Sequence, residues 1–156
     1  GDYEEPLSVQ WAGSANRIVQ ALEAGGWRRP PPWTLRTTLL WLLPSTSVGQ
    51  LPVLAKFHGG ESPAMSFERE LNPSLRLVIR FWPTSYQVGA ASDRPVALWI
   101  GMVTLERLEH PAGMVTLAMT DQDFATSTAQ LAQSLQTQGL HLDIKRRNAA
   151  AVLLVR

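Results

Sequence analysis

The sequence predicts a single α+β domain over residues 1–156, with an antiparallel or mixed sheet of about six to eight strands and about three helices. Two patterns carry this prediction. Apolar residues alternate with polar ones in several short runs, and stretches with helical spacing end at a glycine or a proline. With 45% hydrophobic and 17% charged residues, the chain also has the composition of a globular protein.

The first two predicted elements form a β-α unit. Apolar and polar residues alternate from Leu7 to Trp11, as in a strand with one buried face. Ser14 is a candidate N-cap, and apolar residues then recur at helical spacing over residues 15–24. Gly25 ends this pattern, so we expect a short helix that stops there.

A second helix is predicted after a run of prolines. Residues 27–32 read WRRPPP and are held extended, because a residue before proline is disfavoured in the helical region. Residues 33–43 then follow helical spacing, and Pro44 ends the helix. On a helical wheel, Trp41 falls among threonines, away from the leucines.

Trp41 leaves two alternatives open. Another element packs over it, as is usual for an aromatic residue, or it is an exposed anchor for a membrane surface or protein partner. The second alternative defines a candidate surface that includes the neighbouring basic residues. Its members are Arg28, Arg29, Trp33, Arg36 and Trp41.

Strand periodicity dominates the remainder of the chain. The predicted strands are residues 53–57, 64–69, 75–82, 96–108, 114–119, 140–144 and 150–155. A polar tract over residues 83–95 is predicted to separate two of these strands. A helix capped by Thr120 or Asp121 and ended by Gly139 completes a second β-α-glycine unit, so a β-α pseudo-repeat is predicted on either side of an antiparallel meander.

The strand over residues 75–82 carries the candidate ligand site. Arg76, Arg80 and Trp82 share one face of it, and Trp99 lies on the neighbouring strand. Two alternatives follow: the arginines form a structural layer beneath tryptophan side chains, or they line a groove for an anionic ligand. Gly101 is expected to leave open space beside Trp99, where a shallow groove would fit.

No catalytic constellation is predicted. The spacing of His58, His110 and His141 does not pair them. Asp121 and Asp123 are candidates for a metal site, but two carboxylates at a helix start need further ligands, and capping explains them better. We therefore predict no catalytic residue, no metal and no cofactor.

The net charge, the lengths of the apolar runs and the absence of cysteine argue against other classes of protein. The formal net charge is +1 and the basic residues form no long run, so we expect no nucleic-acid partner. No apolar run reaches the roughly 18–20 residues of a membrane-spanning helix, and no signal peptide is found. The chain has no cysteine, hence no disulfide. Because it begins at Gly1 without methionine, we expect neighbouring segments outside it.

Five motifs, in a fixed order, resemble the C-terminal domain of the LssY family. They are ALEAGGW, PPPW, LPVL, LRLVIRFWP and ALWIGMVT. The resemblance spans nearly the whole chain. It implies a soluble domain associated with the bacterial inner membrane, appended to DedA-like or type-2 phosphatidic-acid phosphatase modules, on a side of the membrane that it does not fix.

The resemblance also implies a function class. We expect a non-catalytic accessory domain that binds or positions a lipid-phosphate ligand or a protein partner. Its partners would be a membrane-embedded module of the same polypeptide or complex, and anionic lipid. Two alternatives stay open: a hydrolase of phosphorylated or glycosylated envelope lipids that uses Asp121, Asp123 and a histidine, and a purely structural oligomerisation domain.

Overall fold

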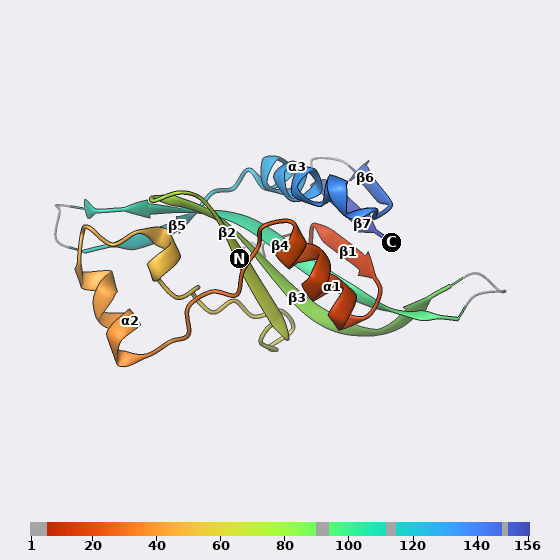
Figure 1. The fold of residues 1–156 in the computed structure, drawn as a ribbon, viewed down its shortest axis with the longest axis horizontal. Helices are drawn as coiled ribbons and strands as arrows, with labels where there is room; N and C mark the ends of the chain where they lie inside the picture. Colours follow the sequence, from red (N-terminus) through yellow and green to blue (C-terminus); the bar gives the residue numbers. More distant parts are fainter. Residues whose placement is uncertain (1–5, 90–93, 112–114, 148–149) are drawn as a thin grey trace.

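The computed structural model describes residues 6–89, 94–111, 115–147 and 150–156, which form a mixed seven-stranded sheet and three α-helices (Figure 1). The predicted α+β class is confirmed. The strands are β1 (Val9–Ala12), β2 (Met65–Asn72), β3 (Leu75–Val88), β4 (Val96–Glu109), β5 (Leu117–Thr120), β6 (Leu142–Arg147) and β7 (Ala150–Val155). The helices are α1 (Ala15–Ala24), α2 (Leu35–Leu39) and α3 (Phe124–Leu135), with 3-10 turns η1 (Leu40–Leu42), η2 (Val48–Gln50) and η4 (Gln136–Gln138).

The sheet is built around the long β3-β4 pair. The strand order is β2-β3-β4-β1-β7-β6, and β5 also pairs with β4. Only the β1-β7 pair is parallel among these strands, which makes the sheet mixed. β1 pairs with the first part of β4 and β5 with its last part, on the edge that β3 leaves free. The two β-α units thus start from one edge of the same strand, and the pseudo-repeat itself stays a prediction.

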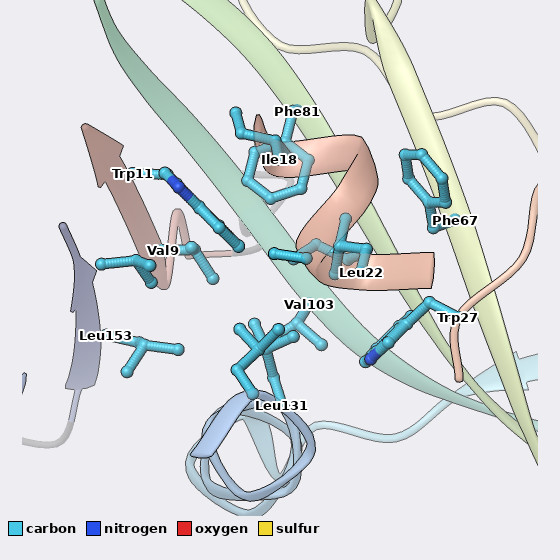
Figure 2. Packing of buried hydrophobic residues seen from close by; sticks show 14 of the residues in the cluster. Val9, Trp11, Ile18, Leu22, Trp27, Phe67, Phe81, Val103, Leu131 and Leu153 are labelled. Atoms are coloured by element: carbon cyan, nitrogen blue, oxygen red, sulfur yellow. The ribbon is translucent and has the colours of Figure 1, made fainter. Parts of the chain in front are cut away.

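The main core lies between one face of the sheet and the helices α1 and α3 (Figure 2). Ile18 and Leu22 of α1 and Leu131 of α3 are fully buried there. The ring of Trp11 packs edge-on against Phe81, with 6.0 Å between centroids. Burying an aliphatic side chain of this size stabilises the fold by roughly 1.5–3 kcal/mol, so the contacts of α1 and α3 with the sheet hold this layer together.

Local signals set the ends of the helices. Ser14 caps α1, as predicted, and accepts a hydrogen bond from the N–H of Arg17. For α3 the predicted cap was wrong: the cap is Asp123, and Asp121 accepts from the N–H of Asp123 at 3.0 Å. Gly139 has φ 65° and ends the following 3-10 turn, in the left-handed conformation that glycine favours.

Three predicted boundaries were wrong. Residues 53–57 form no strand. β3 continues to Val88, through half of the predicted polar tract, with an irregularity after Pro83, which has no N–H to donate. The helix predicted over residues 33–43 divides into the five-residue α2 and the turn η1. Met114, the first residue of one predicted strand, lies outside the described residues.

A segment without strands covers part of the opposite face of the sheet. We call residues 45–58 the strap. Its side chains Val48 and Leu51 are fully buried and form a second, smaller core with Leu108. The strap therefore closes over β2, β3 and β4 on the side away from α1 and α3.

Candidate functional site

Two arginines of β3 lie buried beneath the strap, with exposed fractions of 0% for Arg76 and 1% for Arg80. Nε and Nη2 of Arg76 lie 2.9 and 2.8 Å from Oε2 of Glu106. Nη1 of Arg76 donates to Oε2 of Glu68 at 2.9 Å. Arg80 donates to Oε1 of Glu106, also at 2.9 Å, and to the hydroxyl of Thr104. We call this arrangement the charged layer.

The charged layer also holds the strap. Four backbone carbonyls accept hydrogen bonds from it: Val48, Leu51 and Pro52 from Arg76, and Leu54 from Arg80. A buried carbonyl without a donor is costly, and a guanidinium group supplies five N–H donors in a fixed geometry. This explains why residues 53–57 form no strand, since side chains rather than a neighbouring strand bind this stretch.

Arg28 extends the charged layer to the edge of the sheet. Its Nε lies 3.0 Å from Oε1 of Glu68, and its Nη2 lies 3.3 Å from Oε2 of Glu70 and 3.1 Å from the carbonyl of Gly49. Burial raises the pKa of the Glu68 carboxyl, and the guanidinium groups of Arg76 and Arg28 offset part of that rise. Each buried carboxylate of the layer is therefore matched by guanidinium groups.

The four predicted ligand-binding residues are occupied by contacts within the protein. Arg76 and Arg80 bind carboxylates and carbonyls, which favours the structural alternative over an anion-binding groove. Their partners are not the tryptophans. Trp82 is 2% exposed and donates from Nε1 to the carbonyl of Glu61, and Trp99 is half-buried against the main core. A ligand-binding role for these four stays a prediction.

The open space expected at Gly101 is not present. A Cβ at this position would lie 3.0 Å from two ring carbons of Phe81 and 3.1 Å from the carbonyl of Arg80. The glycine therefore permits close approach of a neighbouring strand, and the shallow groove predicted beside Trp99 was wrong at this point.

The α2 segment is stabilised by its own polar side chains. Thr34 and Thr37 form a reciprocal cap in which each side chain accepts from the other's backbone N–H. The hydroxyl of Thr37 also donates to the carbonyl of Pro32 at 2.8 Å, and that of Thr38 donates to the carbonyl of Thr34. Because these hydroxyls are satisfied within the segment, the helix can begin at Leu35 although none of its residues is buried.

Five large apolar side chains of residues 33–43 face outward. Leu35, Leu39 and Leu42, at the helical spacing i, i+4 and i+7, are 80, 52 and 57% exposed. Trp33 and Leu43 are exposed by about half as well. We call these five residues the α2 surface. Large apolar side chains gathered on one exposed stretch commonly mark a membrane or protein contact.

Two stacked indoles join the α2 surface to the interior. The ring centroids of Trp33 and Trp41 are 6.4 Å apart, and their planes are inclined by only 7°. Nε1 of Trp33 donates to the carbonyl of Val53 at 3.0 Å. Trp41 is half-buried against the core of the strap that contains Val48 and Leu108. Trp41 thus packs in part against this core and Trp33 is the exposed indole, which favours the packing alternative; an anchor role for Trp41 stays a prediction.

The stretch of sequence that carries the α2 surface has charged side chains of one sign. Residues 24–60 contain no aspartate and no glutamate. Arg28 is used by the charged layer, whereas Arg29 and Arg36 are exposed. Arg29 lies 5.1 Å from the ring centroid of Phe67, and Arg36 has no ion pair among the described residues. The absence of acidic residues from 24–60 is the signal in the sequence that marks this surface.

The candidate catalytic groups are dispersed or already in use. His58 packs edge-on against Trp82, with 5.8 Å between ring centroids. Asp123 accepts from the N–H and the hydroxyl of Thr126 at 3.0 and 2.6 Å, and these bonds lower the pKa of its carboxyl. Across the described residues, no three histidine, aspartate or glutamate side chains converge as metal ligands would.

Comparison with known proteins identifies one family. A family model described as LssY C-terminus matches residues 1–151. No curated protein and no solved structure matches the chain significantly. The matched residues include the charged layer, the strap and the α2 surface.

Proposed function

The chain belongs to the LssY C-terminus family, and from this premise we propose that it is a non-catalytic accessory domain of a bacterial membrane protein, which docks on an anionic lipid surface through the α2 surface. The observation that carries the proposal is the α2 surface itself. Five large apolar side chains are exposed on one segment, within a stretch of 37 residues, 24–60, that has basic side chains and no acidic ones.

The chemistry of the segment matches the interface of a bilayer. Tryptophan and leucine side chains partition into the region between headgroups and acyl chains, while arginines remain at the phosphates. Each arginine near an anionic surface contributes about 1 kcal/mol to binding, and each apolar side chain adds in proportion to the area that it buries. Arg29 and Arg36, which are both exposed, would supply the electrostatic part.

The docking is expected to be weak and reversible. α2 has five residues, and the described part of the chain holds no helix long and apolar enough to cross a bilayer. A short apolar segment gives only marginal membrane affinity alone, much as a single acyl chain does. We therefore propose that the α2 surface orients a domain that another segment already holds at the membrane.

The rigidity of the α2 surface favours a role in positioning the domain on a membrane over a role in which the segment refolds around a ligand. Trp33 is fixed by its stack on Trp41 and by its bond to Val53, and the strap beneath is bound by the charged layer. Little ordering of these groups is needed on docking, so less conformational entropy is lost. The hydrolase alternative has no comparable support, because Asp121 and Asp123 are engaged at the start of α3.

Vesicle binding tests the proposal. The protein is mixed with vesicles of phosphatidylglycerol and phosphatidylcholine, and with vesicles of phosphatidylcholine alone, and its tryptophan emission and sedimentation are measured. We expect a blue shift and sedimentation with the anionic vesicles, both reduced by added salt. A Trp33→Phe variant should still sediment with the anionic vesicles, but the blue shift of its tryptophan emission should be much smaller. Failure to sediment with anionic vesicles, together with self-association in light scattering, would instead support a protein contact.

A further inference from the structure

Part of the sheet face opposite α1 and α3 lacks the cover that the strap provides elsewhere. Ala12 of β1, Leu98 of β4 and Leu154 of β7 alternate along their strands with the core residues Trp11 and Val155 and so point to this face. All three are only half-buried, and neither hydrophobic cluster includes them. The sheet thus presents an apolar floor without a partner among the described residues.

A cavity of about 800 Å³ lies over this floor. Its lining includes Ala12, Leu98 and Leu154, and also Val88 and Val96 from the projecting end of the β3-β4 pair. The volume falls within the range of about 300–1,000 Å³ that is usual for small-molecule sites. Val88 and Val96 are exposed, so the cavity opens to solvent at this end.

Two arginines stand at the margin of the cavity. Arg17 comes from α1, and Arg156 follows β7 and is held there by reciprocal backbone hydrogen bonds with His141 at 3.0 and 3.1 Å. Both side chains are exposed, and neither has an ion pair among the described residues. Among the described residues that line the cavity there is no aspartate and no glutamate. The charged side chains in this described lining are therefore both guanidinium groups, and they stand beside an apolar floor.

We propose that this cavity binds a single-chain amphiphile with an anionic head, either a carboxylate or a phosphate monoester. The alkyl chain would lie on Ala12, Leu98 and Leu154, and the head would face Arg17 and Arg156. Guanidinium groups suit both heads, because their planar donors bind two oxygens at once. The site is separate from the α2 surface, which lies toward the other end of the long axis (Figure 1).

Calorimetric titration of the 156-residue chain distinguishes the parts of this proposal. The probes are dodecanoate, dodecyl phosphate, dodecyltrimethylammonium and inorganic phosphate, all below their micelle concentrations. We expect saturable 1:1 binding of both anionic amphiphiles, and binding of the cationic one that is weaker by about tenfold or more. Inorganic phosphate alone should not bind measurably. Equal affinities for anionic and cationic amphiphiles, or no saturable binding, would overturn the proposal.

Two variants locate the site. Leu98→Trp fills the floor and should weaken dodecanoate binding by about tenfold or more. Arg17→Gln, at an exposed position where folding should be unaffected, should weaken it by about three- to fivefold and leave the cationic amphiphile no worse bound. Lys145→Gln, outside the lining, is the control. Unchanged dodecanoate binding in both variants would overturn the proposal, as would its loss in a Leu35→Glu, Leu39→Glu variant of the α2 surface.

Discussion

Arg76 and Glu106 join the two longest strands of the sheet through a hydrogen bond of 2.9 Å and a further ion-pair contact of 2.8 Å, between side chains that are almost completely buried. Arg76→Met would leave Glu106 and Glu68 without this cation and several strap carbonyls without a donor. Because removal of one partner leaves an uncompensated buried charge, we expect a loss of about 3–5 kcal/mol in the free energy of unfolding. Urea denaturation measures it.

The matched control for this prediction is Lys145→Met. Lys145 and Asp143 form an exposed pair at 3.9 Å, and such pairs contribute only about 0–1 kcal/mol. If Arg76→Met were no more destabilising than this control, the charged layer would not be what holds the strap to the sheet.

The second prediction concerns the leucines of α2. The double variant Leu35→Glu, Leu39→Glu places two negative charges on side chains that are largely exposed, so the melting temperature should change little. Binding to anionic vesicles should fall by at least about tenfold, since both apolar area and favourable charge are lost. Sedimentation with vesicles measures this.

Ile144→Glu is the matched control for the leucine variant. Ile144 is an exposed apolar residue of β6, and one negative charge there, half of the charge change in the double variant, should leave vesicle binding close to that of the wild type. Equal losses in the two proteins would mean that net charge, and not the α2 surface, governs binding.

The third prediction concerns the close approach of strands at Gly101. Gly101→Ala places a methyl group about where Phe81 and the carbonyl of Arg80 already lie, and the resulting overpacking should destabilise the protein by about 1–3 kcal/mol. Ala97→Val, an exposed change on the same strand, should stay within about 0.5 kcal/mol of the wild type. An unchanged unfolding free energy for Gly101→Ala would mean that the strands separate there at no cost.

Much of the fold could be predicted from local patterns. Period-two alternation located β3 and β4, and it placed Arg76 and Arg80 on the face away from the main core. Ser14 and Gly139 were identified from capping chemistry alone, because their roles depend on the adjacent backbone. These signals are short-range, so the neighbouring sequence contains them.

The candidate site depended on contacts between distant segments. Residues 53–57 have the composition of a strand, but the side chains of Trp33 and Arg80 bind the carbonyls of Val53 and Leu54 in place of a neighbouring strand. The leucines of α2 have the spacing of a buried helix face, yet the side packed inward is that of Leu40 and Trp41. Periodicity shows that a helix has an apolar side, but it does not show what covers that side.

The last prediction concerns the acid sensitivity of the α3 cap. Hydrogen bonds from the hydroxyl and the N–H of Thr126, and from the N–H of Ala125, lower the pKa of the Asp123 carboxyl below its ordinary value of 3.8. The folded state thus releases this proton more readily than the unfolded chain. The stability that the carboxylate contributes is present above pH 3.8 and is lost as the pH falls through the lower folded pKa.

Thermal unfolding of three proteins between neutral pH and about pH 2 tests this. The wild type should have a higher melting temperature than Asp123→Ala at neutral pH. The difference between these two melting temperatures should decrease in acid, because the carboxylate is protonated there. Asp123→Asn keeps a capping oxygen that does not titrate. The difference between its melting temperature and that of Asp123→Ala should therefore stay constant over the same pH range. If the melting-temperature difference between the wild type and Asp123→Ala also stayed constant, the cap would act through its neutral hydrogen bonds. The charge of the carboxylate would then add nothing to the stability of α3.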